Sequence, residues 1–309
     1  MNLIKVKITP LSSFITFPKG DTIFGHFAYH SFLKGEEIFK NYTEEKPKII
    51  FSDILPNRYI YKPTLPSICF IEKGDKSKEE WDKEKKWLEE NKKEFKKKSW
   101  IGLSDLKNIK IQDKVDFRPY VKLNFYKTDI RVRNSLNRVS FTTGADGFDP
   151  FSLEEIVFNY QPVIYIMYDK PFTREEILKR LNHIGKVGFG KKGSIGKGHF
   201  RAEIDGKFKG FDEIESKYYL TLSPTILNRQ PYIKDAYYNT FNRFGKYHST
   251  FTPFKKPLLM ADSGAVIELE ERREYIGRGI DNGINNQSLV QGYSILVPFK
   301  FNGKGLDNG

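Results

Sequence analysis

Cysteine is almost missing from this sequence. Its single cysteine, Cys69, cannot form an internal disulfide, and without further thiols it cannot build a cysteine metal site. Long apolar runs are missing as well: no stretch approaches the roughly 20 residues of a membrane helix, and the opening MNLIKVKITP lacks the apolar segment of a signal peptide. We therefore expect a cytoplasmic protein with no membrane partner and no redox chemistry.

Aromatic residues and positive charge, by contrast, are plentiful. Hydrophobic residues make up 39% of the 309 residues and aromatic residues 15%, which is enough to build packed cores and excludes a wholly disordered chain. The length suits one large domain or two ordinary ones, and we start from two. The chain carries 52 Lys and Arg against 39 Asp and Glu, a net charge of +13, and such a surplus attracts polyanions. Nucleic acid is therefore the first partner to consider.

The most lysine-rich segment does not hold this surplus. Residues 71–98 carry 11 Lys against 9 Asp and Glu, a net charge of only +2. Within them Trp81, Leu88 and Phe95 recur every seven residues between charges of both signs, which is typical of a solvent-exposed amphipathic helix packed along one apolar stripe. We expect a lysine-rich helical insertion at about 73–98, and we look for the binding site elsewhere.

Hydrophobic periodicity predicts the order of the elements. Strands are predicted at residues 3–8, where apolar residues alternate with lysines, at 14–17, at the β-prone run 163–168 and at 199–204, and the segments 115–125 and 140–143 also look extended. Apolar spacing of three and four indicates a helix from Asp21 to about Gly35, capped by Asp21 or Thr22, and a second helix from its cap Thr173 through Ile184. Without insertions, residues 1–208 follow the order strand, helix, strand, strand, helix, strand of a ferredoxin-like fold, which the RNA-recognition motif shares.

Residues 209–309 are interpreted as a second, degenerate copy of this fold. Strands are predicted at 218–222 and 292–301, with a turn-rich stretch around Ile276 and its glycines between them. We therefore predict an α+β protein of two ferredoxin-like (RRM-like) domains, 1–208 and 209–309.

A glycine-rich run is the most informative segment. Residues 185–200, GKVGFGKKGSIGKGHF, contain six glycines and four lysines. Gly188, Gly190 and Gly193 spell GxGxxG, but a helix precedes the run and a strand follows it, which is the reverse of a dinucleotide-binding turn, and a phosphate-binding Walker loop would need Lys and Ser or Thr after the last glycine. What remains is a flexible loop that lets backbone N–H groups and lysines approach phosphates. The alternative is a basic surface turn that binds nothing.

Five histidines are the candidates for catalysis. His26 and His30 lie one turn apart on the first predicted helix, but HFAYH lacks the Glu of a zincin motif and offers no third ligand. A metal-free ribonuclease would need a histidine with a pKa near 7 beside the scissile phosphate. We predict no catalytic residue, no metal and no cofactor.

Five blocks of the sequence resemble a known family. They are GDTIFGHFAYHSF at 20–32, SDILPNRYIYKP at 52–63, RNSLNRVSFTTG at 133–144, GFGKKGSIGKG at 188–198 and FKKPLLMADSGAVI at 254–267. Together they resemble the RAMP superfamily of CRISPR proteins, and within it the family of subunits numbered four in type III-A (Csm) effector complexes. The resemblance implies two ferredoxin-like domains that cap the 5′ end of the crRNA, hold its repeat-derived handle and contact the large cyclase subunit and the first backbone RAMP subunit in antiviral defence. The lysine-rich helix has no counterpart in that family.

The resemblance also assigns residues to RNA. A β-hairpin called the thumb would push between the crRNA and its target RNA, with a tip that carries little apolar surface. Phe141 and Phe148 lie near this hairpin and would be suited to stacking on a base, although core packing is the expected role of aromatic residues here. The implied RNA-binding residues are, in the glycine-rich loop, Lys186, Gly188, Phe189, Gly190, Lys191, Lys192, Gly193, Ser194, Gly196 and Lys197; at the start of the first helix, Gly20, Asp21, Thr22 and His26; in the thumb, Arg131, Arg133, Asn134, Asn137 and Arg138; and as candidate handle contacts Arg243, Tyr247, Lys255 and Lys256.

Alternatives stay open at this point. The alternative for the RNSLNR segment is a polar surface hairpin with incidental arginines, although its position and charge favour RNA binding. A crRNA-processing, metal-free endoribonuclease of the same superfamily would use His26 or His30 as general acid or base. A single-stranded RNA binder outside CRISPR would share the same folds.

Overall fold

The computed structural model covers most of the chain. The residues it describes are 1–44, 46–65, 77–110, 120–143, 149–227, 231–245, 255–281 and 288–302. No helix in these ranges is both long and apolar enough to cross a membrane.

The first half is built on one antiparallel sheet covered by two helices. Its elements are β1 (Asn2–Pro10), α1 (Gly20–Leu33), β2 (Ile49–Phe51), β10 (Pro162–Tyr168), α3 (Arg174–Val187) and β11 (Phe200–Ile204). They follow the predicted β-α-β-β-α-β order, and in space the strands lie in the order β11-β1-β10-β2, with β3 (Leu55–Pro56) also paired to β10. Every residue of β10 is buried, because Leu181 and Ile184 of α3 lie near Ile164 on one face while Phe208 and Phe211 pack on Tyr165.

Two local predictions in this half are wrong. Residues 14–17 are not a strand, since only Phe14 makes an isolated bridge, to Ile156. The first helix is capped by the backbone at Lys19 and not by the side chains of Asp21 or Thr22, because the Asp21 carboxylate is engaged by Arg243. The second cap is confirmed: the Thr173 hydroxyl accepts a hydrogen bond from the backbone N–H of Glu176 at 3.2 Å.

The second half consists of strands. A second antiparallel sheet has the order β13-β16-β12-β18-β17, and a separate hairpin joins β14 to β15. Their bounds are β12 (Tyr218–Thr221), β13 (Ile233–Tyr237), β14 (Thr240–Arg243), β15 (Leu258–Ala261), β16 (Val266–Leu269), β17 (Tyr275–Asp281) and β18 (Leu289–Pro298). The described residues after 208 contain no helix, so the mixed α+β class is confirmed but the second ferredoxin-like copy is not. The domain boundary at 208 stays a prediction.

The stretch around Ile276 is a strand and not the predicted series of turns. Its glycines have a packing reason: a Cβ on Gly277 would lie 2.0 Å from the carbonyl oxygen of Gly292 on β18. Glycine therefore lets β17 and β18 approach closely, and the sequence signal of a turn arises from strand contact.

The two halves share a core. Helix α1 packs on β18, and one large apolar cluster contains residues of both sheets. At the junction the buried side-chain amide of Gln291 accepts a hydrogen bond from Phe51 N–H at 2.8 Å and donates one to Phe51 C=O at 2.7 Å. Gly20 is needed here, because a Cβ would lie 2.4 Å from the Phe51 oxygen and 2.7 Å from Ser223 Cβ.

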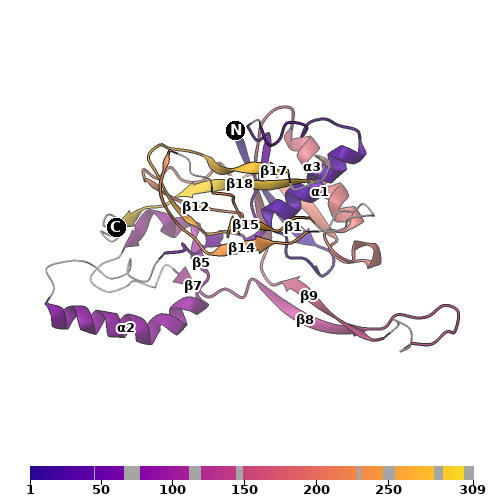
Figure 1. Ribbon diagram of the computed structural model, residues 1–309, viewed down its shortest axis with the longest axis horizontal. Coiled ribbons are helices and arrows are strands. Elements are labelled where there is room, and N and C mark those ends of the chain that lie inside the picture. The colour runs from indigo at the N-terminus through magenta and orange to yellow at the C-terminus, as the bar shows by residue number, and fades with distance from the viewer. Residues whose placement is uncertain are drawn as a thin grey trace.

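Two insertions project from this body on one side (Figure 1). The lysine-rich helix is α2 (Lys78–Lys97), which begins with a capping box between Ser77 and Glu80. Phe95 packs edge-on against Tyr120 at 5.5 Å, while Trp81 stays partly exposed, so the predicted stripe contacts the body at its C-terminal end. Short elements at its base are β4 (Tyr59–Tyr61), β5 (Trp100–Gly102), η2 (Leu103–Asn108), β6 (Ile109–Lys110), β7 (Tyr120–Val121) and β19 (Phe301–Asn302).

The second insertion is a long antiparallel ribbon of β8 (Tyr126–Arg133) and β9 (Phe151–Phe158) (Figure 1). The hairpin is therefore longer than the predicted 133–143: Arg133 ends β8, and residues 134–143 form part of the distal loop. Residues 140–143 are not extended, because a turn covers 138–140 and no strand follows among the described residues of the loop. Of the segment 115–125, residues 120–121 form β7, residues 122–125 are not a strand and residues 115–119 lie outside the described ranges.

Candidate nucleic-acid interface

The glycine-rich loop has a narrow neck and an exposed head. At the neck the N–H of Phe189 donates to the carbonyl of Gly198 at 2.8 Å, and Gly198 N–H donates to Ser13 C=O at 2.9 Å. A Cβ on Gly198 would lie 2.1 Å from the Phe189 oxygen, and its φ of 71° also favours glycine. The head, residues 190–196, closes on the short 3₁₀ turn η3 (Gly193–Ile195).

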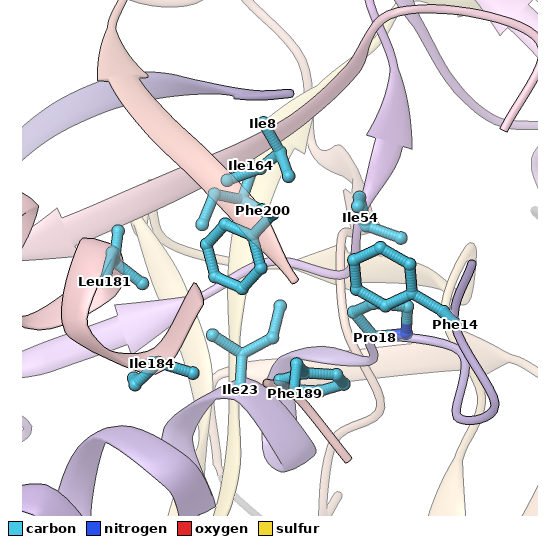
Figure 2. Close-up of a pocket in the computed structure, with 10 residues that line it drawn as sticks. All are labelled: Ile8, Phe14, Pro18, Ile23, Ile54, Ile164, Leu181, Ile184, Phe189 and Phe200. Carbon is cyan, nitrogen blue, oxygen red and sulfur yellow. The ribbon is translucent and has the colours of Figure 1, made fainter. Parts of the chain in front are cut away.

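Phe189 is turned inward and anchors this loop. Its side chain is 2% exposed and points into an apolar pocket beside Ile23, Pro18 and Phe14 (Figure 2). The aromatic ring contributes to the core and so does not line the surface of an RNA cleft, contrary to the sequence expectation. It fixes the base of the head, whose exposed residues are Lys191, Lys192, Ser194, Ile195 and Gly196.

Two contacts set the direction of the head. The N–H of Lys191 donates to the Thr16 hydroxyl at 3.2 Å, and the Lys192 ammonium lies 5.3 Å from the centre of the Phe151 ring on β9. The side chains of both lysines are exposed. Lys186, on the last turn of α3, is exposed as well, and together these residues give the loop a positive outer surface.

Lys197 faces the other way. It is 8% exposed, and its ammonium lies 2.7 Å from the Glu155 carboxylate and 2.8 Å from the Ser13 hydroxyl. Its charge is used inside the protein, so the structure corrects the expectation that Lys197 contacts phosphate. Sequence reasoning missed Glu155, whose only sequence signal is an acidic residue within the otherwise strand-like LEEIVF.

Glu155 gathers cations from the hairpin and the loop. Besides Lys197 and Ser13, its carboxylate is 3.1 Å from Arg133 Nη2 and 3.5 Å from Arg131 Nε. Burial alone would raise the pKa of Glu155, but hydrogen bonds from Lys197, Ser13 and Arg133 outweigh it and lower the pKa to about 2. The glycine-rich loop and the hairpin are thus joined through one ionised carboxylate.

The start of α1 is tied to the second half of the chain. Gly20 N–H donates to the buried Asp53 carboxylate at 2.7 Å, and both Asp21 carboxylate oxygens accept from the Arg243 guanidinium, which also donates to the Thr22 hydroxyl at 3.3 Å. The structure therefore brings two predicted RNA-binding groups together, but through an internal ion pair. Asp21 is buried, and its charge is neutralised by Arg243.

Lys255 lies near this pair and is partly exposed. Burial and the neighbouring Arg243 lower the pKa of Lys255, while Asp21 opposes the shift. Lys256 is exposed. Tyr247, the remaining candidate handle contact, lies outside the described residues.

His26 lies under the loop head as a neutral hydrogen-bond acceptor. Gly190 N–H donates to His26 Nε2 at 3.1 Å, and the imidazole lies 4.6 Å from the Phe189 ring. Burial lowers the pKa of His26 to about 4. A histidine that is neutral at pH 7 and whose Nε2 is already occupied is poorly suited to general acid or base work.

His30 does not form a metal site with His26. Its ring instead contacts the His183 ring of α3, with 4.5 Å between centres, and burial together with the charge of His183 lowers its pKa. Among the described residues no group of three or more His, Cys, Asp or Glu is placed to hold a metal ion.

The exposed apolar side chains of β8 lie on the face of the hairpin away from Glu155. Directly opposed residues of an antiparallel pair share a face, so Arg131 and Arg133 lie on the side of Glu155, while Ile130 and Val132 lie on the other and are exposed. In the distal loop Leu136, Val139 and Phe141 are exposed too, the last at 78%. The expectations of a tip with little apolar surface and of a core role for Phe141 are therefore both wrong.

The other thumb residues have mixed roles. Asn134 and Arg138 are exposed, whereas the side chain of Asn137 accepts hydrogen bonds from the N–H groups of Val139 and Ser140, at 2.9 and 3.3 Å, and so stabilises the turn. Phe148 lies outside the described residues.

Comparison with known proteins identifies the fold. No protein-family model matches the sequence, and no curated protein matches it. The chain is similar to the Csm4 subunit in a crystal structure of a Csm1–Csm4 cassette in complex with pppApA, with 16% identity, a TM-score of 0.56 and coverage of 97% of this chain and 98% of the other. It is also similar to the Csm4 subunit of a Csm3–Csm4 subcomplex in the type III-A CRISPR-Cas interference complex, with 18% identity, a TM-score of 0.58 and coverage of 96% and 99%. The resemblance found in the sequence is confirmed at the level of the fold, along nearly the whole chain.

Proposed function

We propose that this chain is the RAMP subunit that caps the crRNA in a type III-A CRISPR effector complex. It would bind the 5′ repeat-derived handle without cutting RNA, and bridge the large cyclase subunit to the backbone RAMP subunits. The observation that carries the proposal is the fold likeness to Csm4, which spans both halves of the chain at once. Chance sharing of a single ferredoxin-like unit would not produce such coverage.

The solved relatives also support the proposed partners. Csm4 is bound to Csm1 in one structure and to Csm3 in the other. We infer that this chain contacts the corresponding large subunit and a backbone subunit, in the cytoplasm, where the crRNA and its target RNA meet.

The surface supports RNA as the ligand. Lys191 and Lys192 lie exposed on the head of the glycine-rich loop, and Arg131 lies exposed on the adjacent hairpin, in a chain with a net charge of +13. Exposed lysines and arginines of this kind contact the phosphate backbone and carry no sequence preference. We propose that the handle crosses this region and that the hairpin lies between the crRNA and the target RNA.

The nuclease alternative finds less support. A metal-free crRNA-processing enzyme needs a histidine that exchanges protons near pH 7. His26 has a pKa near 4 and an occupied Nε2, and the pKa of His30 is lowered as well. We therefore propose a scaffold and not an enzyme.

Two experiments test the proposal. Affinity purification of the tagged chain from its native host should recover RNAs that share one repeat-derived 5′ end, together with a large subunit and a backbone RAMP subunit. Recovery of RNAs with unrelated 5′ ends and no such subunits would indicate a single-stranded RNA binder outside CRISPR. Incubation of the purified chain with repeat RNA in EDTA should leave the RNA whole, and cleavage that His26→Ala or His30→Ala abolishes would establish the nuclease instead.

A further inference from the structure

The feature that the proposed function leaves unexplained is the buried carboxylate of Glu155. It is 1% exposed and lies where the hairpin, the glycine-rich loop and the β1–α1 connection meet. A buried carboxylate is retained only with partners, and here it has the Ser13 hydroxyl at 2.7 Å and three cations. One negative charge therefore organises groups from three segments of the chain.

The cluster keeps a positive surplus. Arg131, Arg133 and Lys197 surround Glu155, and Lys192 lies over Phe151, which is the cross-strand neighbour of Arg133. Asp129, opposite Glu155 in the ribbon, is paired with Lys127 at 3.3 Å, so these two charges offset each other. The four cations and the one carboxylate leave a net charge of +3 between the loop and the hairpin.

The cations divide into an inner and an outer set. Lys197 is buried, whereas Arg131 is 61% exposed, Arg133 is 34% exposed and Lys192 is exposed. The Nε of Arg133 is buried and has no hydrogen-bond partner among the described residues, so the protein alone does not satisfy this guanidinium. The donors that an anion can reach are those of the exposed Arg131 and Lys192 side chains and the exposed part of Arg133.

We propose that Glu155 is a positioning residue for RNA. By holding Lys197 on the inside it fastens the loop to the hairpin, and by orienting Arg131 and Arg133 it aims them, together with Lys192, at one phosphodiester group of the RNA backbone. The inference rests on the proposed RNA-binding function and adds a binding site built jointly by the loop and the hairpin. Phosphate is the chemical class because the two guanidinium groups and the ammonium of Lys192 match its negative charge and its several oxygens.

The Glu155→Gln variant separates positioning from simple electrostatics. Removal of a negative charge makes the surface more basic, so long-range electrostatics alone predicts tighter RNA binding. Positioning predicts the opposite: loss of one phosphate contact lowers the logarithmic salt slope by about 0.7, which weakens binding about fivefold at 0.1 M salt. The matched control is Glu154→Gln, which removes the same charge from the exposed, opposite face of the ribbon, across from Ile130.

The assay is fluorescence anisotropy of labelled oligouridylate with the full chain over a series of salt concentrations. We expect Glu154→Gln to bind as wild type or tighter with an unchanged slope, and Glu155→Gln to bind about fivefold more weakly with the smaller slope. If the two variants behave alike, the proposal is overturned. If wild type binds no RNA, the proposed function fails together with it.

A second variant keeps the test decisive if Glu155→Gln does not fold. Glu155→Gln combined with Lys197→Met replaces both members of the buried ion pair by neutral side chains of similar size and keeps the wild-type net charge. Replacing both partners of a buried ion pair costs much less stability than removing one of them. We expect this double variant to unfold near the wild-type temperature and still to bind oligouridylate about fivefold more weakly. Wild-type affinity and slope in the folded double variant would overturn the proposal.

Discussion

Replacement of His26 by glutamine should change how the stability of the protein depends on pH. In the folded chain the pKa of His26 is lowered from 6.5 to about 4 by burial. The unfolded chain, where the pKa is ordinary, therefore binds a proton first as the pH falls. The contribution of neutral His26 to stability is complete above pH 6.5 and is lost progressively as the pH falls from 6.5 toward 4.

The size of this effect follows from the two pKa values. At pH 7.5 His26 is almost unprotonated in both the folded and the unfolded chain, so it changes the free energy of unfolding very little. At pH 5 the unfolded chain, with a pKa of 6.5, is protonated, and the folded chain, with a pKa of about 4, is not. This difference lowers the free energy of unfolding by about 2 kcal/mol. Urea unfolding followed by circular dichroism at several values between pH 7.5 and pH 5 measures it. We expect the free energy of unfolding of wild type to fall by about 2 kcal/mol more than that of His26→Gln over this interval.

The comparison removes the other titrating groups. His30 and His183 are present in both proteins, and the amide side chain that His26→Gln introduces has no proton to gain, so only the difference between the two curves reports on His26. Parallel curves would refute the lowered pKa of His26, and with it the argument that His26 is unsuited to nuclease chemistry.

Three further outcomes are expected. Gly198→Ala should lower the free energy of unfolding by about 3 kcal/mol and Gly196→Ala by about 1, measured by urea unfolding, because both have positive φ but only the first Cβ meets backbone, at 2.1 Å. Gln291→Ala should lower the free energy of unfolding by about 2 to 4 kcal/mol in the same assay, because the buried N–H and C=O of Phe51 lose their hydrogen-bond partners. A loss under about 0.5 kcal/mol would contradict the claim that Gln291 holds the two halves together. Replacement of Lys191 and Lys192 by Ala should reduce the slope of log K for RNA binding against log salt concentration by roughly one to two units, at unchanged thermal stability. An unchanged slope would show that the loop head does not contact RNA.

The sequence predicted the first sheet well because its elements carry strong local signals. Alternating apolar residues mark β1, the unbroken apolar run PVIYIMY marks the fully buried β10, and Thr173 marks the start of α3. In the second half the signals are weaker: β14 is the polar segment TFNR, which has no apolar alternation of its own. The glycines of β17 were interpreted as turn residues because the local sequence does not show that β18 lies against them.

The sequence predicted an exposed glycine-rich loop but not which of its lysines face outward. Within GKKGSIGKG nothing local separates Lys191 and Lys192 from Lys197, and only Ser13 and Glu155, from two distant segments, draw the last of them inside. Asp21 has every local property of a helix cap, yet an arginine 222 residues later engages its carboxylate. Long-range ion pairs of this kind are decided by the fold, and the sequence alone cannot rank them against local hydrogen bonds.

The junction at Gln291 also bears on how the chain matures during synthesis. Residues 1–208 contain every strand and helix of the first sheet. However, one flank of α1 is covered by β18, and the backbone N–H and C=O of Phe51 bond to Gln291 on that strand. Since β18 is translated after residue 208, these contacts form last. A nascent chain that has produced only the first half therefore leaves the flank of α1 that β18 covers exposed. Under the proposed function, we expect RNA to be bound only after β18 is complete, and a chain interrupted before that strand to be degraded.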